Sequence, residues 1–211
     1  MQNHLRNVGM SLIVSVLSAA CASGYHYVQP QSIEYQSTSG DSAVTVAYQT
    51  SLLSGKYAKR ELTSDVYLVA LKLTNHSSRD IVFKNNIKVY SGEKELTTMD
   101  LNTFYDATQQ NPDKSFLFLF LLPLNVYSFS QTTDGNQVTS QHNNFYPIGL
   151  IVGPALAFGN RAAAKKANKK FKEELDKNDI LEKTIPAGQT ATGFIAIRDN
   201  SSSELNFKTV F

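Results

Sequence analysis

Cysteine is almost absent from this chain of 211 residues, in which Cys21 stands alone. A single cysteine excludes an intramolecular disulfide framework and a zinc site built from several thiolates. Charge of one sign is also lacking, because 20 Lys and Arg oppose 18 Asp and Glu. So small an imbalance gives no electrostatic argument for nucleic acid, and we expect no nucleic-acid partner. With 42% hydrophobic residues the composition is that of an ordinary folded chain, and one domain with an insertion is the expectation.

Catalytic signatures are missing as well. The sequence contains no G-x-S-x-G elbow, H-E-x-x-H pair, P-loop or G-x-G-x-x-G turn. His26, His76 and His142 fall in predicted polar segments, and none has an acidic neighbour at metal-ligand spacing. We therefore expect no catalytic residues, no metal site and no cofactor. An enzyme whose site is assembled from carboxylates of separate loops is the alternative.

The amino-terminal segment lacks a hydrophobic run of membrane-spanning length. Arg6 precedes an apolar stretch at 8–17, and small residues follow it. These are the three regions of an export signal, and the stretch has about half of the roughly 20 residues that a spanning helix needs. Residues 1–20 are therefore predicted to be a signal peptide that is removed.

The residues that follow the apolar stretch are Leu-Ser-Ala-Ala-Cys, at 17–21. They resemble the lipobox of bacterial lipoproteins, with Ser18 at a position usually held by Leu. The resemblance implies that Cys21 becomes the first residue and carries acyl chains such as palmitate, each adding about 0.8 kcal/mol of membrane affinity per buried methylene. It also implies an outer-membrane protein that faces the periplasm, because Ala22 is not the Asp of an inner-membrane retention signal. The alternative is a plain secretory signal cut at a nearby small residue.

Alternating apolar residues predict β-strands over most of the remaining chain. Residues 21–42 are read as a tether and 43–211 as a β-sandwich domain. Val44, Val46 and Tyr48 alternate with polar neighbours, and a second run places four apolar side chains on one face. The members of that second set are Tyr67, Val69, Leu71 and Leu73. Its other face is also largely apolar, as expected for a central strand.

Two turns are predicted between strands. Their sequences are Leu-Thr-Asn-His-Ser at 73–77 and Ile-Pro-Ala-Gly-Gln-Thr at 185–190. Their order is similar to that of small immunoglobulin-like extracytoplasmic domains in bacterial lipoproteins. The resemblance covers residues 43–99 and 184–211. It implies an immunoglobulin-like antiparallel β-sandwich and carries no catalytic residues.

An insertion at 114–182 separates the two strand blocks. It has an apolar arm at 116–124, a polar loop at 131–144 and a second apolar arm at 146–158. Each arm is too short to span about 30 Å of hydrocarbon. The arms are predicted either to pack on the sandwich as an extra core layer or to contact a membrane or a partner. Gly149 and Gly153 would let two backbones approach closely if that piece were helical in lipid.

A helix is predicted over 161–178, with a buried stripe of Ala164, Ala167, Phe171 and Leu175. Its basic half, at 161–172, precedes its acidic half, which is the unfavourable direction for the helix dipole. Its lysines are read either as contacts to lipid phosphates or as a solvated face with the pairs Lys169–Glu173 and Lys170–Glu174.

The paired arms followed by Gly-Asn-Arg-Ala-Ala-Ala-Lys-Lys-Ala-Asn-Lys-Lys-Phe, at 159–171, resemble a family of uncharacterised Gram-negative lipoproteins. That family has no established activity to carry over. The sequence thus predicts a lipid-anchored envelope protein that acts as a non-enzymatic binding or structural module, with an envelope protein as its expected partner. The alternative is a protein that contacts the bilayer or an integral membrane partner through its arms and basic helix. The predicted contact residues are Phe116, Phe118, Phe120, Leu122, Ile148, Ile151, Phe158, Lys165, Lys166, Lys169 and Lys170.

Overall fold

A computed structural model of the chain describes residues 21–134, 137–199 and 204–210. The chain divides into two compact units. Unit 1 comprises residues 1–22 and 111–165, and unit 2 comprises residues 23–110 and 166–211. The long helix α5 (Ile148–Lys177) contributes its residues 148–165 to unit 1 and 166–177 to unit 2. The predicted signal peptide, residues 1–20, lies outside the described residues.

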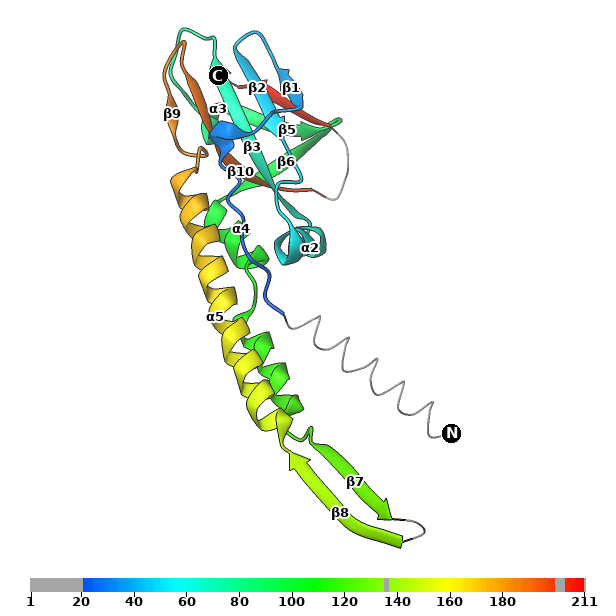
Figure 1. The fold of residues 1–211 in the computed structure, drawn as a ribbon. Coiled ribbons are helices and arrows are strands. Elements are labelled where there is room, and N and C mark those ends of the chain that lie inside the picture. The colour runs from blue at the N-terminus through cyan, green and yellow to red at the C-terminus, as the bar shows by residue number, and fades with distance from the viewer. Residues whose placement is uncertain (1–20, 135–136, 200–203, 211) are drawn as a thin grey trace. The chain divides into compact units, whose positions relative to one another are not determined.

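Unit 2 is built on an antiparallel sheet of seven strands in the order β1-β2-β3-β10-β6-β5-β11 (Figure 1). The two longest strands lie at its centre, where β10 pairs with β3 from Thr190 opposite Thr74 to Arg198 opposite Val66. A mainly β fold with one long helix is therefore confirmed. The strands are β1 (Ser37–Gly40), β2 (Val44–Gln49), β3 (Val66–Asn75), β5 (Ile87–Ser91), β6 (Lys94–Met99), β10 (Thr190–Arg198) and β11 (Leu205–Thr209).

The two outer strands, β1 and β11, meet through side chains of β1 and of the turn after it. The backbone N–H of Phe207 donates to Ser39 Oγ at 3.2 Å, and that of Thr209 donates to Asp41 Oδ2 at 2.7 Å. Desolvation acts to raise the pKa of Asp41, but hydrogen bonds from Thr209, Ala43 and Val44 outweigh it and lower that pKa. The sheet is thus nearly closed on itself. The narrower prediction of an immunoglobulin-like sandwich is not confirmed.

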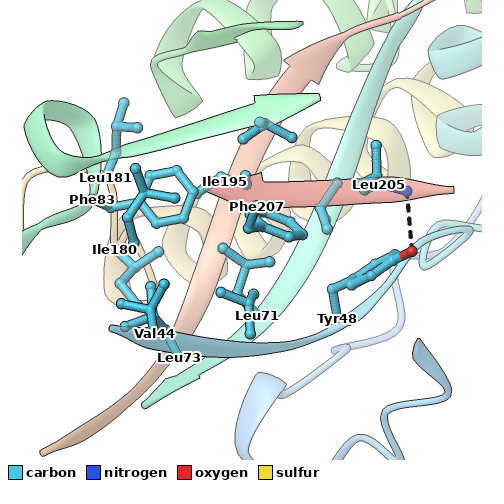
Figure 2. Packing of buried hydrophobic residues seen from close by; sticks show 14 of the residues in the cluster. Val44, Tyr48, Leu71, Leu73, Phe83, Ile180, Leu181, Ile195, Leu205 and Phe207 are labelled. Atoms are coloured by element: carbon cyan, nitrogen blue, oxygen red, sulfur yellow. Dashed lines mark hydrogen bonds between the residues drawn. The ribbon is translucent and has the colours of Figure 1, made fainter. Parts of the chain in front are cut away.

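The inner face of this sheet encloses the larger of the two apolar cores of unit 2 (Figure 2). Leu71 and Ile195 from the central strands face Phe83 and Phe207, which are fully buried or nearly so. The Tyr48 hydroxyl accepts a hydrogen bond from the backbone N–H of Leu205 at 3.0 Å, drawn as the dashed line in Figure 2. The predicted alternation of β2 and the apolar face of β3 are confirmed, since Val44, Val46, Tyr48, Val69, Leu71 and Leu73 all belong to this core.

The outer face of the central strands is covered by helices. Helices α2 (Gly55–Ser64) and α4 (Leu101–Thr108) place Tyr57 and Phe104 in a second core, together with Phe171 and Leu175 from α5. The predicted buried stripe of α5 is confirmed, since Ala164 and Ala167 are also buried. Both faces of β3 are therefore apolar because both are covered. Shorter elements complete unit 2: η1 (Pro30–Ser32), β4 (Ile81–Val82), α3 (Phe83–Asn86) and β9 (Thr184–Ile185).

Glu174 on α5 holds the segment that follows Cys21 in the sequence. Its carboxylate accepts hydrogen bonds from the Tyr25 hydroxyl and from the backbone N–H groups of Val28, at 2.9 Å, and Gln29, at 2.7 Å. Desolvation and the Glu174 hydrogen bond raise the pKa of Tyr25. Tyr25, Pro30 and strand β1 belong to the folded unit, so these parts of the predicted tether at 21–42 are packed. The predicted Lys170–Glu174 pair is replaced by these contacts, while Lys169–Glu173 is present at 3.8 Å.

Unit 1 contains η2 (Pro112–Leu121), the strands β7 (Val126–Asp134) and β8 (Gln137–Tyr146), and the first part of α5. The two strands pair antiparallel, from Val126 opposite Tyr146 to Asp134 opposite Gln137. They occupy most of the segment expected to be a polar loop at 131–144. The second apolar arm is helical, so α5 begins at Ile148 and not at 161 as predicted, because the alanine-rich stretch extends a helix that starts within the arm.

Candidate interaction surface

Glycine lets the two apolar arms of unit 1 cross at backbone distance. A Cβ at Gly149 would lie 1.9 Å from the backbone oxygen of Leu121, and one at Gly153 would lie 3.0 Å from that of Phe118. The Gly149 N–H donates to the Leu124 oxygen at 2.9 Å, which fixes the end of the first arm on the start of α5. The close approach expected from the spacing of these two glycines is therefore present, and it occurs between η2 and α5.

The arms bury little apolar surface against each other. Phe118 and Ala157 are fully buried, and four partly buried side chains pack around them, namely Phe116, Leu119, Leu121 and Leu156. Phe118 was predicted as a contact residue, and its complete burial corrects that prediction. The arms form this cluster inside unit 1, whereas the sheet of the predicted sandwich belongs to unit 2.

Large apolar side chains gather on the outside of unit 1. Of the fourteen that are exposed among the described residues, eleven belong to this unit. Phe120 is 76% exposed, Ile151 74% and Phe158 60%, so these three of the predicted contact residues are accessible. We call the eleven the apolar band: Leu117, Phe120, Leu124, Tyr127, Phe145, Tyr146, Ile148, Leu150, Ile151, Val152 and Phe158.

The 3₁₀ geometry of η2 decides which residues of the first arm are exposed. A strand with a period of two would place Phe116, Phe118 and Phe120 on one face. With three residues per turn, Phe118 shares a face with Leu121, and Phe120 shares the opposite, exposed face with Leu117. The sequence prediction therefore missed Leu117, and the evenly apolar run gave no signal that would separate the two periods.

Charge is nearly absent from the same surface. Between Phe116 and Asn160 the sequence has one formally charged residue, Asp134. Charged groups appear just outside, where Arg161 Nε lies 3.1 Å from Asp113 Oδ1 and the guanidinium lies 5.1 Å from the centre of the Phe116 ring. Of the predicted basic contacts, Lys165 lies in unit 1, and Lys166, Lys169 and Lys170 lie in unit 2.

Cys21, the predicted lipid site, is exposed and belongs to unit 1. The backbone N–H of the next residue, Ala22, donates to Asn160 Oδ1 at 3.0 Å, and Asn160 Nδ2 donates to the Leu156 oxygen at 2.9 Å. Asn160 follows the exposed Phe158 by two positions on α5. The predicted anchor point therefore lies at the level of the last band residue on α5, but on another face of the helix, since positions two apart do not face each other.

A groove on η2 adds shape to this surface. Its volume is about 650 Å³, and Phe116, Leu117, Leu119 and Phe120 form its apolar wall. Asn111, Asp113 and Lys114 complete its lining. Such a mainly apolar lining suits an apolar group of a partner.

Two side chains that could take part in chemistry, Glu61 and His76, lie in unit 2 and form hydrogen bonds within it. Glu61 on α2 is 4% exposed and accepts the N–H of Leu68 at 2.8 Å. Burial raises the pKa of Glu61 to about 7, although this hydrogen bond acts to lower it. His76 is exposed, with Nε2 3.0 Å from Thr45 Oγ1.

Within the described residues, no three His, Cys, Asp or Glu side chains are grouped so that they would hold a metal ion. Nor does a helix of the described part have the length and apolar character needed to cross a membrane. Comparison with known proteins added no identification: no family model, curated protein or solved structure matched the chain.

Proposed function

We propose that this chain is a lipid-anchored cell-envelope protein that acts without catalysis, as a binding or structural module whose interaction surface is unit 1. The observation that carries the proposal is the placing of eleven of the fourteen large exposed apolar side chains in this unit. Single exposed apolar residues are ordinary on a protein surface, whereas large exposed apolar patches mark interaction sites. Membership of the uncharacterised lipoprotein family, an immunoglobulin-like relationship and an outer-membrane location facing the periplasm are part of this proposal.

A lipid on Cys21 agrees with the local structure. The cysteine is exposed, and the chain beyond it is fixed at once by the Ala22 contact to Asn160. Two or three acyl chains give stable attachment, whereas one chain binds only marginally. Attachment at Cys21 would therefore hold unit 1 directly at the membrane surface, because no free linker follows the cysteine.

Direct contact of the apolar arms with the bilayer is the second candidate. The observation in its favour is the sequence of side chains along α5, where the apolar residues 148–158 are followed by exposed cations such as Lys165. Cations beside an anionic lipid surface contribute about 1 kcal/mol each.

Intact mass and detergent partition of the membrane fraction test both candidates, with wild type compared with Cys21→Ala. We expect wild type to lack residues 1–20, to carry acyl mass and to enter the detergent phase, and Cys21→Ala to remain in the aqueous phase. A wild-type Cys21 without acyl mass would refute the anchor. If Cys21→Ala still enters the detergent phase and Cys21→Ala/Ile151→Ser/Phe158→Ser does not, the bilayer candidate replaces the first.

A further inference from the structure

The strands β7 and β8 form a ribbon with open edges. They have nine and ten residues, and within the described residues they pair with each other and with no other strand. An isolated two-stranded ribbon is at best marginally stable in water, and three or more strands are normally needed. Because the outward edges of β7 and β8 pair with no other strand of the described residues, the ribbon has the length and the edges to accept a further strand on either side.

Native proteins usually protect such edges with lysines, prolines or inward-pointing charges. The segment 125–146 contains no Lys, Arg, Glu or Pro, and its one formal charge is Asp134. Proline appears just outside, at Pro123 and Pro147. Lysine and proline are thus missing as barriers to edge-to-edge pairing, and the one irregularity of the described ladder, between Thr132 and Thr133, lies in the half of the ribbon away from Val126 and Tyr146.

The apolar band lies next to the ribbon in the same unit. Tyr127, Phe145 and Tyr146 of the band are residues of the strands themselves, at the end of the ribbon nearest η2 and α5 in the sequence. From Ile148 to Phe158 the helix rises about 15 Å, which is half of the roughly 30 Å hydrocarbon core of a bilayer. Along the chain, this α5 part of the band is preceded by the ribbon and followed by Arg161 and Lys165.

This order of surfaces disfavours a bilayer as the occupant of the band. Insertion that starts with the ribbon would place open strand edges in hydrocarbon, where each unsatisfied backbone group costs several kcal/mol. Insertion from the other end would first bring Arg161 and Lys165 into hydrocarbon, which is costly as well. A protein partner meets no such obstacle, because interface cores are depleted of charge and enriched in aromatic residues. The nearly uncharged segment 116–160 has that composition.

We propose that the partner is a second copy of this chain, and that copies associate through unit 1 by pairing the ribbon edges and packing the apolar bands together. The inference rests on the proposed function, in which unit 1 is the interaction surface. Copies anchored in one leaflet share a direction, so the edge of β8 in one copy meets the edge of β7 in the next as an antiparallel neighbour. One contact then satisfies the open edges and covers the band. Such a head-to-tail contact closes into a ring when its rotation allows.

The test measures the protein mass of the full-length chain in mild detergent by light scattering. Ser130→Lys in β7 and Ser140→Lys in β8, combined, place a charge on each edge strand, and Ser78→Lys in an exposed turn of unit 2 is the matched control. We expect wild type and Ser78→Lys to contain two or more chains per particle, and the double variant to contain one. A chain lacking residues 128–144, with an unchanged thermal midpoint of unit 2, is also expected to contain one.

Three results would overturn the inference. Wild type at one chain per particle at the highest concentration would refute self-association. If the Ser130→Lys/Ser140→Lys chain and the chain lacking residues 128–144 both keep the wild-type particle mass, the ribbon does not mediate self-association. Cys21→Ala binding as single chains to vesicles of phosphatidylcholine and phosphatidylglycerol would make the bilayer the occupant. The absence of acyl mass on Cys21 would refute the proposed anchor. It would not decide self-association, because the dependence of particle mass on the ribbon is measured independently.

Discussion

Replacing Glu61 with glutamine is expected to remove a pH-dependent part of the stability of unit 2. The carboxyl is 4% exposed, and burial raises its pKa from 4.5 to about 7. Between these two values the folded state keeps a proton that the unfolded state releases, so the free energy of unfolding falls as pH rises. At about 1.4 kcal/mol per unit of pKa, the change across this window is about 3 kcal/mol.

Glutamine keeps an oxygen that accepts the Leu68 N–H, and it does not ionise. The stability of wild type minus that of Glu61→Gln is therefore expected to fall by about 3 kcal/mol from pH 4.5 to pH 7.5, and to be level on either side. Urea unfolding followed by tyrosine fluorescence at four pH values measures this difference. Glu34→Gln, at an exposed position, is the control. A difference for Glu61→Gln that stays constant across the whole range would show that burial does not shift this carboxyl.

Two further substitutions test the internal contacts of the protein, one in unit 1 and one in unit 2. Gly149→Ala places a Cβ 1.9 Å from the Leu121 oxygen and is expected to make unit 1 sensitive to protease, whereas Gly159→Ala, with no atom within 4 Å of the new Cβ, leaves it resistant. Glu174→Ala leaves the N–H groups of residues 28 and 29 without their acceptor and is expected to lower the free energy of unfolding of unit 2 by about 1–3 kcal/mol. Urea unfolding of Glu174→Ala against the exposed Glu173→Ala checks this, and equal stability of the two would contradict the role of Glu174.

Sequence periodicity predicted strands such as β2, β3, β10 and β11 because one or both faces of each are buried in a regular way, whereas β1, β7 and β8 were not predicted. Val44, Val46 and Tyr48 show this in β2, and Ala167 and Phe171 show the same regularity in α5. The helix α2 was missed because one of its two buried residues is a glutamate, Glu61, while its one leucine, Leu62, is exposed. The local sequence does not indicate that Glu61 is buried, because its burial depends on β3, whose Leu68 N–H it accepts.

The candidate surface was predicted as a segment and not as a set of side chains. Both arms were found because they are continuous runs of apolar residues, but such runs carry no period that tells an inner from an outer face. Phe118 and Phe120 show the difficulty, since one is fully buried and the other largely exposed. Their different exposures follow from the 3₁₀ geometry of η2 and from its crossing with α5 at Gly149. A sequence pattern alone determines neither feature.

The strand order of unit 2 has a consequence for how the chain folds as it is made. The central strand β10 and the closing strand β11 follow all the other strands in the sequence, yet β10 separates β3 from β6 and β11 completes the sheet. A chain that emerges amino end first therefore holds β3 and β6 with unpaired edges until residues 190–209 arrive. Pairings between distant segments are slow to form. The two strands of unit 1 are neighbours in the sequence, so its ribbon is able to form before the central strand β10 of unit 2 has been synthesised.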